Sequence, residues 1–148
     1  RLGVRMGALS DLTVLRRLTP EDVEIEKATI VKRRDSAQRL VDLMESDGTS
    51  DFVVTDDQGK YCGMVTSSDL RAALVYREAI PLLQVSELQR SELPTISLDE
   101  TLDIVLDKFS RSDVQSLVLV TDQGDISGLI TRASLMKRYQ EALNEDAN

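Results

Sequence analysis

The first half of the chain opens with apolar positions that predict a short strand and then a helix. The strand is Thr29-Ile30-Val31. From about Ser36 to Glu45, apolar residues recur at i, i+3, i+4 and i+7, the spacing of one helical face. Gly48 then predicts the end of the helix, because glycine accepts the left-handed conformation that follows a last turn.

A hairpin and a second helix come next. The apolar runs 52–55 and 61–65 flank the turn residues 56–59, which predicts two buried strands joined by a tight turn. Thr66 is expected to open the second helix, with Leu70, Ala73 and Leu74 on its inner face and Pro81 as the residue that ends it.

The second half of the chain repeats this pattern at a fixed offset. Gly63-Met64-Val65-Thr66-Ser67-Ser68-Asp69-Leu70 returns as Gly128-Leu129-Ile130-Thr131-Arg132-Ala133-Ser134-Leu135. Self-similarity at a fixed offset predicts a duplicated structural unit. The second copy is expected to contain these elements: a strand at 95–96, a helix from Thr101, a hairpin of 117–120 and 126–130, and a helix from about Arg132 to Leu143.

The segments outside the two copies give a weaker pattern. Leu9, Leu12, Leu15 and Leu18 lie three apart, as on one helical face, and Thr19-Pro20-Glu21-Asp22 resembles a helix start. Ser86-Glu87-Leu88 resembles a short capped turn. The predicted divisions are these: linker and helix 1–24, repeat one 25–80, bridge 81–92, repeat two 93–143 and a frayed polar tail 144–148.

The fold class that follows is α/β (α+β), with two pseudo-symmetric β-α-β-β-α repeats packed sheet to sheet. Apolar residues on both faces of the short strands favour this arrangement, since helices cover only one face. A lone repeat is small for an independent core.

Composition narrows the possible functions. The formal charge of −8 and the lack of a large basic cluster make nucleic acid a poor partner, because binding to its phosphates requires several clustered cations. With no His and one Cys, zinc sites, disulfide frameworks and histidine catalysis are not expected. No nucleophile is paired with a base, so we expect no catalytic residue and no enzyme activity of this chain. We expect Asp56-Asp57 and the acids from Glu141 to Asp146 to be solvated rather than metal ligands.

The duplicated strings identify a family resemblance. "LVDLMESDGTSDFVVTDDQGKYCGMVTSSDL" and "IVLDKFSRSDVQSLVLVTDQGDISGLITRASL" resemble a tandem pair of cystathionine-β-synthase (CBS) domains, a Bateman module, over roughly 25–143. Such modules regulate an attached channel, transporter or enzyme, and many bind adenine nucleotides between the repeats. The resemblance implies no required cofactor and a possible ATP, ADP or AMP ligand.

The resemblance also implies two nucleotide sites. In the first, Thr66 would meet phosphate or ribose and Asp69 the ribose hydroxyls, with the base held by Pro94, Thr95, Ile96 and Leu117. The second would use Thr131, Ser134, Thr29, Ile30 and Phe52. We expect the second to be weaker, because Ser134 stands where the family has an aspartate and makes a single neutral hydrogen bond.

Helix capping is the alternative explanation for both elements. Thr followed three residues later by Asp is close to a capping box, and Thr131 with Ser134 resembles a plain N-cap.

The parent protein is suggested by shorter strings. "REAIPLLQVSEL" and "LMKRYQEAL" resemble the cytoplasmic tail of ClC-type chloride channels and transporters. Because the chain begins at Arg1, we interpret it as a fragment whose opening residues follow a last membrane helix. The expected partners are the transmembrane domain of the parent, at the cytoplasmic face of the membrane, and a second copy in a homodimer. Contacts of that dimer could use Leu70, Leu74, Leu135 and Tyr139, with core packing as the competing explanation.

The resemblance leaves two alternative functions: a ligand-free dimerisation and assembly module, or the regulator of another transporter or a metabolic enzyme.

Overall fold

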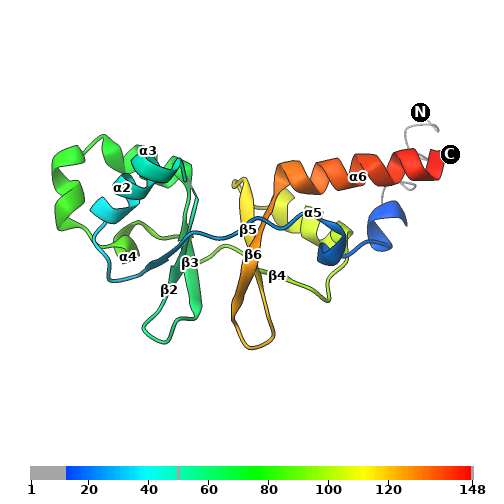
Figure 1. Cartoon of the computed structure of the whole chain (residues 1–148), viewed down its shortest axis with the longest axis horizontal. Coiled ribbons are helices and arrows are strands. Elements are labelled where there is room, and N and C mark those ends of the chain that lie inside the picture. Colours follow the sequence, from blue (N-terminus) through cyan, green and yellow to red (C-terminus); the bar gives the residue numbers. More distant parts are fainter. Residues whose placement is uncertain (1–12, 50, 148) are drawn as a thin grey trace. The chain divides into compact units, whose positions relative to one another are not determined.

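A computed structural model describes residues 13–49 and 51–147 of the chain, which divides into two compact units. Unit 2 comprises 27–93 together with 122–127, and unit 1 contains the rest. Each unit is built around one three-stranded sheet (Figure 1). The α/β class and the duplicated architecture predicted from the sequence are confirmed.

Unit 2 contains the elements of repeat one. They are β1 (Ile30–Lys32), α2 (Gln38–Asp47), β2 (Phe52–Thr55), β3 (Tyr61–Val65), α3 (Ser67–Leu74), η2 (Arg77–Leu82) and α4 (Val85–Leu88). The sheet order is β1-β2-β3, with β1 parallel and β3 antiparallel to β2. The strands β2 and β3 match the sequence prediction residue for residue.

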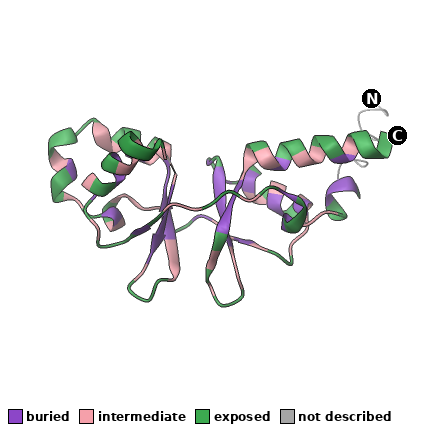
Figure 2. Ribbon diagram, viewed as in Figure 1, coloured by how far each residue is buried: buried purple, intermediate pink, exposed green. Residues whose placement is uncertain are grey.

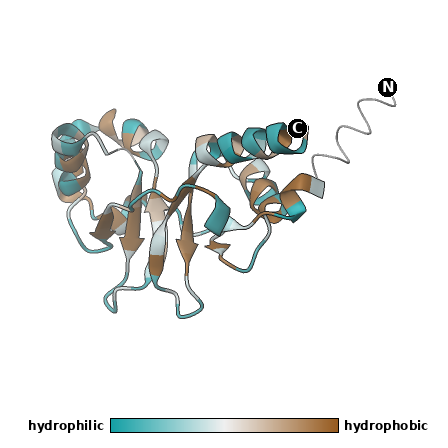
Figure 3. Cartoon of the chain, turned by 45° about the vertical axis from the view of Figure 1, so that its right-hand side comes forward, coloured by the Kyte–Doolittle hydropathy of each residue, from teal (hydrophilic) through white to brown (hydrophobic). Residues whose placement is uncertain are grey.

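The core of unit 2 lies between its sheet and its helices. Leu40 and Val41 of α2 and Leu70 of α3 are buried with alternate residues of the strands. Gly48 has φ +70° and its N–H donates to Met44 O at 3.1 Å, so it ends α2 as predicted. Strand β2 is buried at all four of its positions (Figure 2), and the strands of both units are predominantly hydrophobic (Figure 3).

Unit 1 contains the elements of repeat two together with part of the N-terminal segment. They are η1 (Pro20–Asp22), β4 (Ile96–Ser97), α5 (Leu102–Ser110), β5 (Ser116–Val120), β6 (Ile126–Thr131) and α6 (Arg132–Ala147). The order β4-β5-β6 reproduces that of the first sheet, and β4 is parallel to β5. Leu102, Val105 and Phe109 of α5 are fully buried.

Each sheet is extended by one residue from the segment that precedes the other repeat. Glu26 pairs with Leu129 of β6, and Arg90 pairs with Met64 of β3, each through two backbone hydrogen bonds of 2.7–3.0 Å. The repeat glycines permit this approach. A Cβ on Gly63 would lie 2.7 Å from Arg90 O, and one on Gly128 would lie 2.7 Å from Glu26 O. Close packing of backbone on backbone therefore explains why both elements begin with glycine.

Three details of the prediction are wrong. The second helix does not continue to Pro81: α3 ends at Leu74, and Pro81 lies inside η2. Val75 and Tyr76, which follow α3, are about three-quarters exposed, so no buried apolar contact favours a longer helix there.

The other two concern the ends of unit 1. The helix predicted from Thr19 is a single 3₁₀ turn, because Val23 and Ile25 alternate with acids after Asp22, a period that favours extended chain, and Val23 is both extended and buried. The tail 144–148 is not frayed over its whole length, since α6 continues to Ala147 and Arg17 pairs with Asp146 at 2.5 Å. Residues 13–16 are helical, but Leu9 and Leu12 lie outside the described residues.

Candidate functional site

Thr66 and Asp69 form a complete capping box at the start of α3. The Thr66 Oγ1 accepts a hydrogen bond from Asp69 N at 3.2 Å. In return, Thr66 N and Thr66 Oγ1 both donate to Asp69 Oδ2, at 3.1 and 2.8 Å. Thr66 is 6% exposed and Asp69 is half-buried. The capping box predicted for Thr66 and Asp69 is therefore present in the structure.

The capping box leaves part of Asp69 available for another contact. The two hydrogen bonds that its carboxylate accepts both fall on Oδ2, and Oδ1 has no hydrogen bond among the residues that the structure describes. An ionised carboxylate offers about four acceptor positions. Capping and recognition of a ligand hydroxyl are therefore compatible at Asp69.

The corresponding element of unit 1 makes a smaller network. Thr131 Oγ1 accepts from Ser134 N at 3.0 Å and lies 3.0 Å from Ser134 Oγ. This is the N-cap expected from the sequence. The serine supplies no negative charge, so a diol-binding carboxylate is missing from this position.

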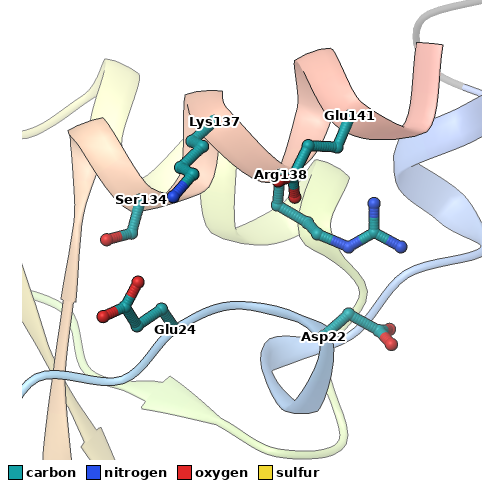
Figure 4. Close-up of a pocket in the computed structure, with 6 residues that line it drawn as sticks. All are labelled: Asp22, Glu24, Ser134, Lys137, Arg138 and Glu141. Atoms are coloured by element: carbon teal, nitrogen blue, oxygen red, sulfur yellow. The ribbon is translucent and has the colours of Figure 1, made fainter. Parts of the chain in front are cut away.

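Ser134 faces an open cleft of about 240 Å³ between α6 and the segment around η1 (Figure 4). Lys137 and Glu24 lie beside it, with the Lys137 ammonium directed into the space between Ser134 and Glu24. Arg138, Glu141 and Asp22 complete the lining. Three acids and two bases nearly offset one another, so this cleft does not favour a strongly charged ligand of either sign.

The residues expected around the base are brought together in pairs within each unit. In unit 1, Pro94 and Thr95 lead into β4, and Ile96 pairs with Leu119, two residues from Leu117. Ile96 and Leu117 are completely buried, whereas Pro94 and Thr95 are half-buried. A ligand could reach Pro94 and Thr95 directly, but it could contact the other two only after a rearrangement.

In unit 2, Thr29 precedes β1, Ile30 begins β1, and Phe52 begins the neighbouring strand β2. Phe52 is completely buried in the core, whereas Ile30 is 48% exposed, which is unusual for a strand isoleucine. Ile30 is therefore the member of this set that is open to a ligand.

Sequence reasoning missed Arg132, the most highly connected side chain near these elements. Its guanidinium donates to the carbonyl oxygens of Phe109, Ser112 and Val114, the last two at 2.6 and 2.7 Å. It also lies 5.3 Å from the centre of the Phe109 ring. Arg132 thus caps the C-terminal end of α5 from the start of α6. Repeat one has Ser67 at this position, so the repeat pattern gave no signal for it.

The helix faces proposed for dimer contacts have different roles. Leu70 and Leu135 are 0% and 1% exposed, and Leu74 packs against the core of unit 2, so core packing accounts for these three. Tyr139 is half-buried. The large apolar side chains that are most exposed among the described residues are Val75, Tyr76 and Leu82 of the region from α3 to η2.

Two searches of the described residues were negative. No cluster of three or more Cys, Asp or Glu side chains is arranged to hold a metal ion. No described helix has both the length and the hydrophobicity of a membrane span.

The comparisons with known proteins agree on the family. The sequence profile of the CBS domain matches residues 21–76 and again 85–141, which is most of the chain. The chain therefore belongs to the CBS domain family, with two such domains in tandem, and constitutes a CBS-pair regulatory module.

Individual relatives are distant. Inosine-5'-monophosphate dehydrogenase of Aquifex aeolicus is 26% identical over 163 residues, which cover 99% of this chain and 33% of the enzyme. The chain thus spans about a third of that relative.

Solved structures show the same fold. The CBS domain of the bacterial CNNM/CorC family Mg²⁺ transporter superposes with a TM-score of 0.71 at 17% identity, covering 88% of this chain and 80% of the other. CbpB in complex with c-di-AMP superposes with a TM-score of 0.62 at 24% identity, covering 87% and 84%.

Proposed function

We propose that this CBS pair regulates an attached membrane transport protein by binding an adenine nucleotide at Thr66 and Asp69. The observation that carries the proposal is the different use of the two Asp69 carboxylate oxygens. Oδ2 accepts the capping hydrogen bonds from Thr66, and Oδ1 is left to accept a hydrogen bond from a ribose hydroxyl. Pro94 and Thr95 are the accessible residues proposed to contact the base. The complex of the similar protein CbpB with c-di-AMP, a ligand that contains adenine nucleotides, supports this ligand class.

Regulation by such a ligand is a shift between conformational states of the parent. A nucleotide can move a gate only by the difference between its affinities for the two states. ClC-type channels and transporters are the proposed parents, from the strings at 77–88 and 135–143, with this module at the cytoplasmic face. The similarity to the CBS domain of an Mg²⁺ transporter supports attachment to a transport protein. The exposed Val75, Tyr76 and Leu82 support association of two copies.

Calorimetric titration with ATP, ADP and AMP tests the nucleotide site. Asp69→Asn keeps an acceptor oxygen for the Thr66 N–H and removes the charge, so it separates capping from binding. We expect the variant to retain its thermal stability while its nucleotide affinity falls by about tenfold, the loss of a charge-assisted hydrogen bond. Equal heats from the wild type and the variant would remove Asp69 from the proposal.

A second candidate is a ligand-free assembly module. Two observations favour it. The Thr66–Asp69 and Thr131–Ser134 pairs already hydrogen-bond to each other as helix caps, and position 134 has a serine in place of the aspartate. In that case, millimolar nucleotide leaves the melting temperature of the wild type unchanged, because a ligand that binds only the folded state must raise it. The oligomeric state is measured in parallel by sedimentation equilibrium.

A third candidate is the regulator of a metabolic enzyme, favoured by the similarity to inosine-5'-monophosphate dehydrogenase. The coding sequence upstream of Arg1 distinguishes the parents. Many long apolar helices there support the transporter, and a catalytic domain supports the enzyme.

A further inference from the structure

A group of cations in unit 2 is unusual for a chain of net charge −8. Lys32 ends β1, Arg33 and Arg34 follow in the turn after it (32–35, the basic turn), and Arg39 lies on the first turn of α2. All four residues are exposed. The acids among them are Asp35, 3.6 Å from Arg39, and Asp57, 3.0 Å from Arg34. Lys32 and Arg33 make no ion pair with a carboxylate in the part of the chain that the structure describes.

The second repeat shows that the fold does not require these cations. At the offset that relates Gly63 to Gly128, the four positions are occupied by Ser97, Leu98, Asp99 and Ile104. The turn is nevertheless the same. Lys32 N donates to Asp35 Oδ2 at 3.0 Å, and Ser97 N donates to Glu100 Oε1 at 3.0 Å.

The return hydrogen bonds of the two turns also correspond. The Asp35 N–H donates to Lys32 O at 3.0 Å, and the Glu100 N–H donates to Ser97 O at 3.2 Å. The two repeats therefore form the same turn with and without the cations. The geometry of the turn does not require positive charges at these positions.

The basic turn is held rigidly. Arg33 N donates to Thr55 O at 3.0 Å, and Arg33 O accepts from Ser86 N at 2.9 Å. Asp35 O accepts from Val85 N at 2.8 Å, so the turn is fixed to the sheet on one side and to α4 on the other. A backbone fixed in this way loses little conformational freedom on binding, which favours affinity.

Lys32 and Arg39 line an open cleft of about 290 Å³ beside β1. Its other walls are Ile30, Val31, Asp35 and Thr55. Since water occupies about 30 Å³ per molecule in the liquid, the cleft has room for at least one phosphate group. Exposed Ile30 adds an apolar wall, and Asp35 adds one negative charge that Arg39 already faces.

We propose that Lys32 and Arg39, flanked by Arg33 and Arg34, bind the phosphate groups of a small anionic ligand in this cleft. Arginine presents paired N–H donors that match phosphate oxygens, and lysine adds a point charge. The site requires neither a base nor a ribose, so it goes beyond the nucleotide binding proposed for Asp69 and does not depend on it.

Calorimetric titration of the whole chain with inorganic tripolyphosphate tests the site. The variant Lys32→Ser/Arg39→Gln removes two cations from the cleft. The control Arg71→Gln/Arg77→Gln removes two exposed cations elsewhere in unit 2 and changes the net charge equally. We expect the cleft variant to bind at least tenfold more weakly than the wild type, and the control to stay within threefold. Binding by the wild type is also expected to weaken at high salt.

Two results would overturn the proposal: no measurable binding by the wild type, or equal weakening in the two double variants, which would show a net-charge effect. Circular dichroism checks folding, and Arg39→Gln alone serves if the double variant unfolds. ATP and inositol trisphosphate then distinguish a nucleotide from a lipid headgroup as the carrier of the phosphates. Tripolyphosphate binding that persists in Asp69→Asn separates this site from the nucleotide site.

Discussion

Gly63→Ala is expected to lower the free energy of unfolding by about 2 kcal/mol, because the added methyl group collides with backbone. A Cβ at this position would lie 2.7 Å from Arg90 O and 3.0 Å from Gln89 Nε2. Reaching an ordinary contact of 3.4 Å requires the 89–90 segment to move by about 0.7 Å.

The movement acts on two hydrogen bonds. Met64 N donates to Arg90 O at 3.0 Å, and Arg90 N donates to Met64 O at 2.7 Å. Losing both costs about 2 kcal/mol, and residual overpacking adds roughly 1. The lower entropy of alanine in the unfolded chain offsets about 0.4–1 kcal/mol.

Urea denaturation followed by circular dichroism measures the change, and hydrogen exchange at the Met64 and Arg90 amides locates it. The double variant Gly63→Ala/Gln89→Ala is the control. It removes the collision of the new methyl group with the Gln89 side chain and keeps its collision with the Arg90 carbonyl oxygen. We expect no rescue. A loss below about 0.5 kcal/mol, less than a single net hydrogen bond contributes, would refute the argument that the backbone of the crossing segment demands glycine. Full rescue by Gln89→Ala would refute it equally.

Substitutions at three further positions probe other features. Arg132→Met is expected to cost about 2–3 kcal/mol in chemical denaturation, because three carbonyl oxygens lose a charged donor; Arg132→Lys should recover only part, since a compact ammonium cannot span them, and full recovery would contradict this. Tyr61→Phe is expected to leave stability unchanged or to raise it, since the Tyr61 hydroxyl is buried without a hydrogen bond among the described residues; a clear loss would reveal a partner. Burial raises the pKa of Tyr61 from 10.0 to about 12, so between these pH values the unfolded chain releases this proton first and stability falls as pH rises; spectroscopic titration of phenolate should show a late step that Tyr61→Phe removes. Asp69→Ala, which unlike Asp69→Asn removes the cap, is expected to cost about 1 kcal/mol in a thermal or urea melt even without ligand, and no loss would contradict the capping geometry.

Local spacing was sufficient to predict β2, β3 and the end of α2. The apolar runs at 52–55 and 61–65 and the stop at Gly48 follow from side-chain period and glycine conformation, and the structure has them where the sequence indicates. The constant offset between the two copies then identified the duplicated architecture.

Features that depend on distant segments were not predictable in the same way. The contacts of Arg132 with the end of α5 join residues 18 to 23 positions apart, and no local pattern encodes them. The end of α3 at Leu74 depends on the lack of apolar contacts at Val75, which is a tertiary property. For the candidate site, the sequence identified the Thr66 and Asp69 pair, but only coordinates show that capping occupies one carboxylate oxygen.

Glu26 extends the sheet of repeat two and Arg90 extends the sheet of repeat one, which affects any attempt to divide this chain into separate halves. Any cut in the bridge leaves the C-terminal piece without Glu26, and a cut before Arg90 also removes that residue from the first sheet. The two halves are alike in sequence and fold, but a C-terminal half expressed alone lacks the two backbone hydrogen bonds that Glu26 makes with Leu129.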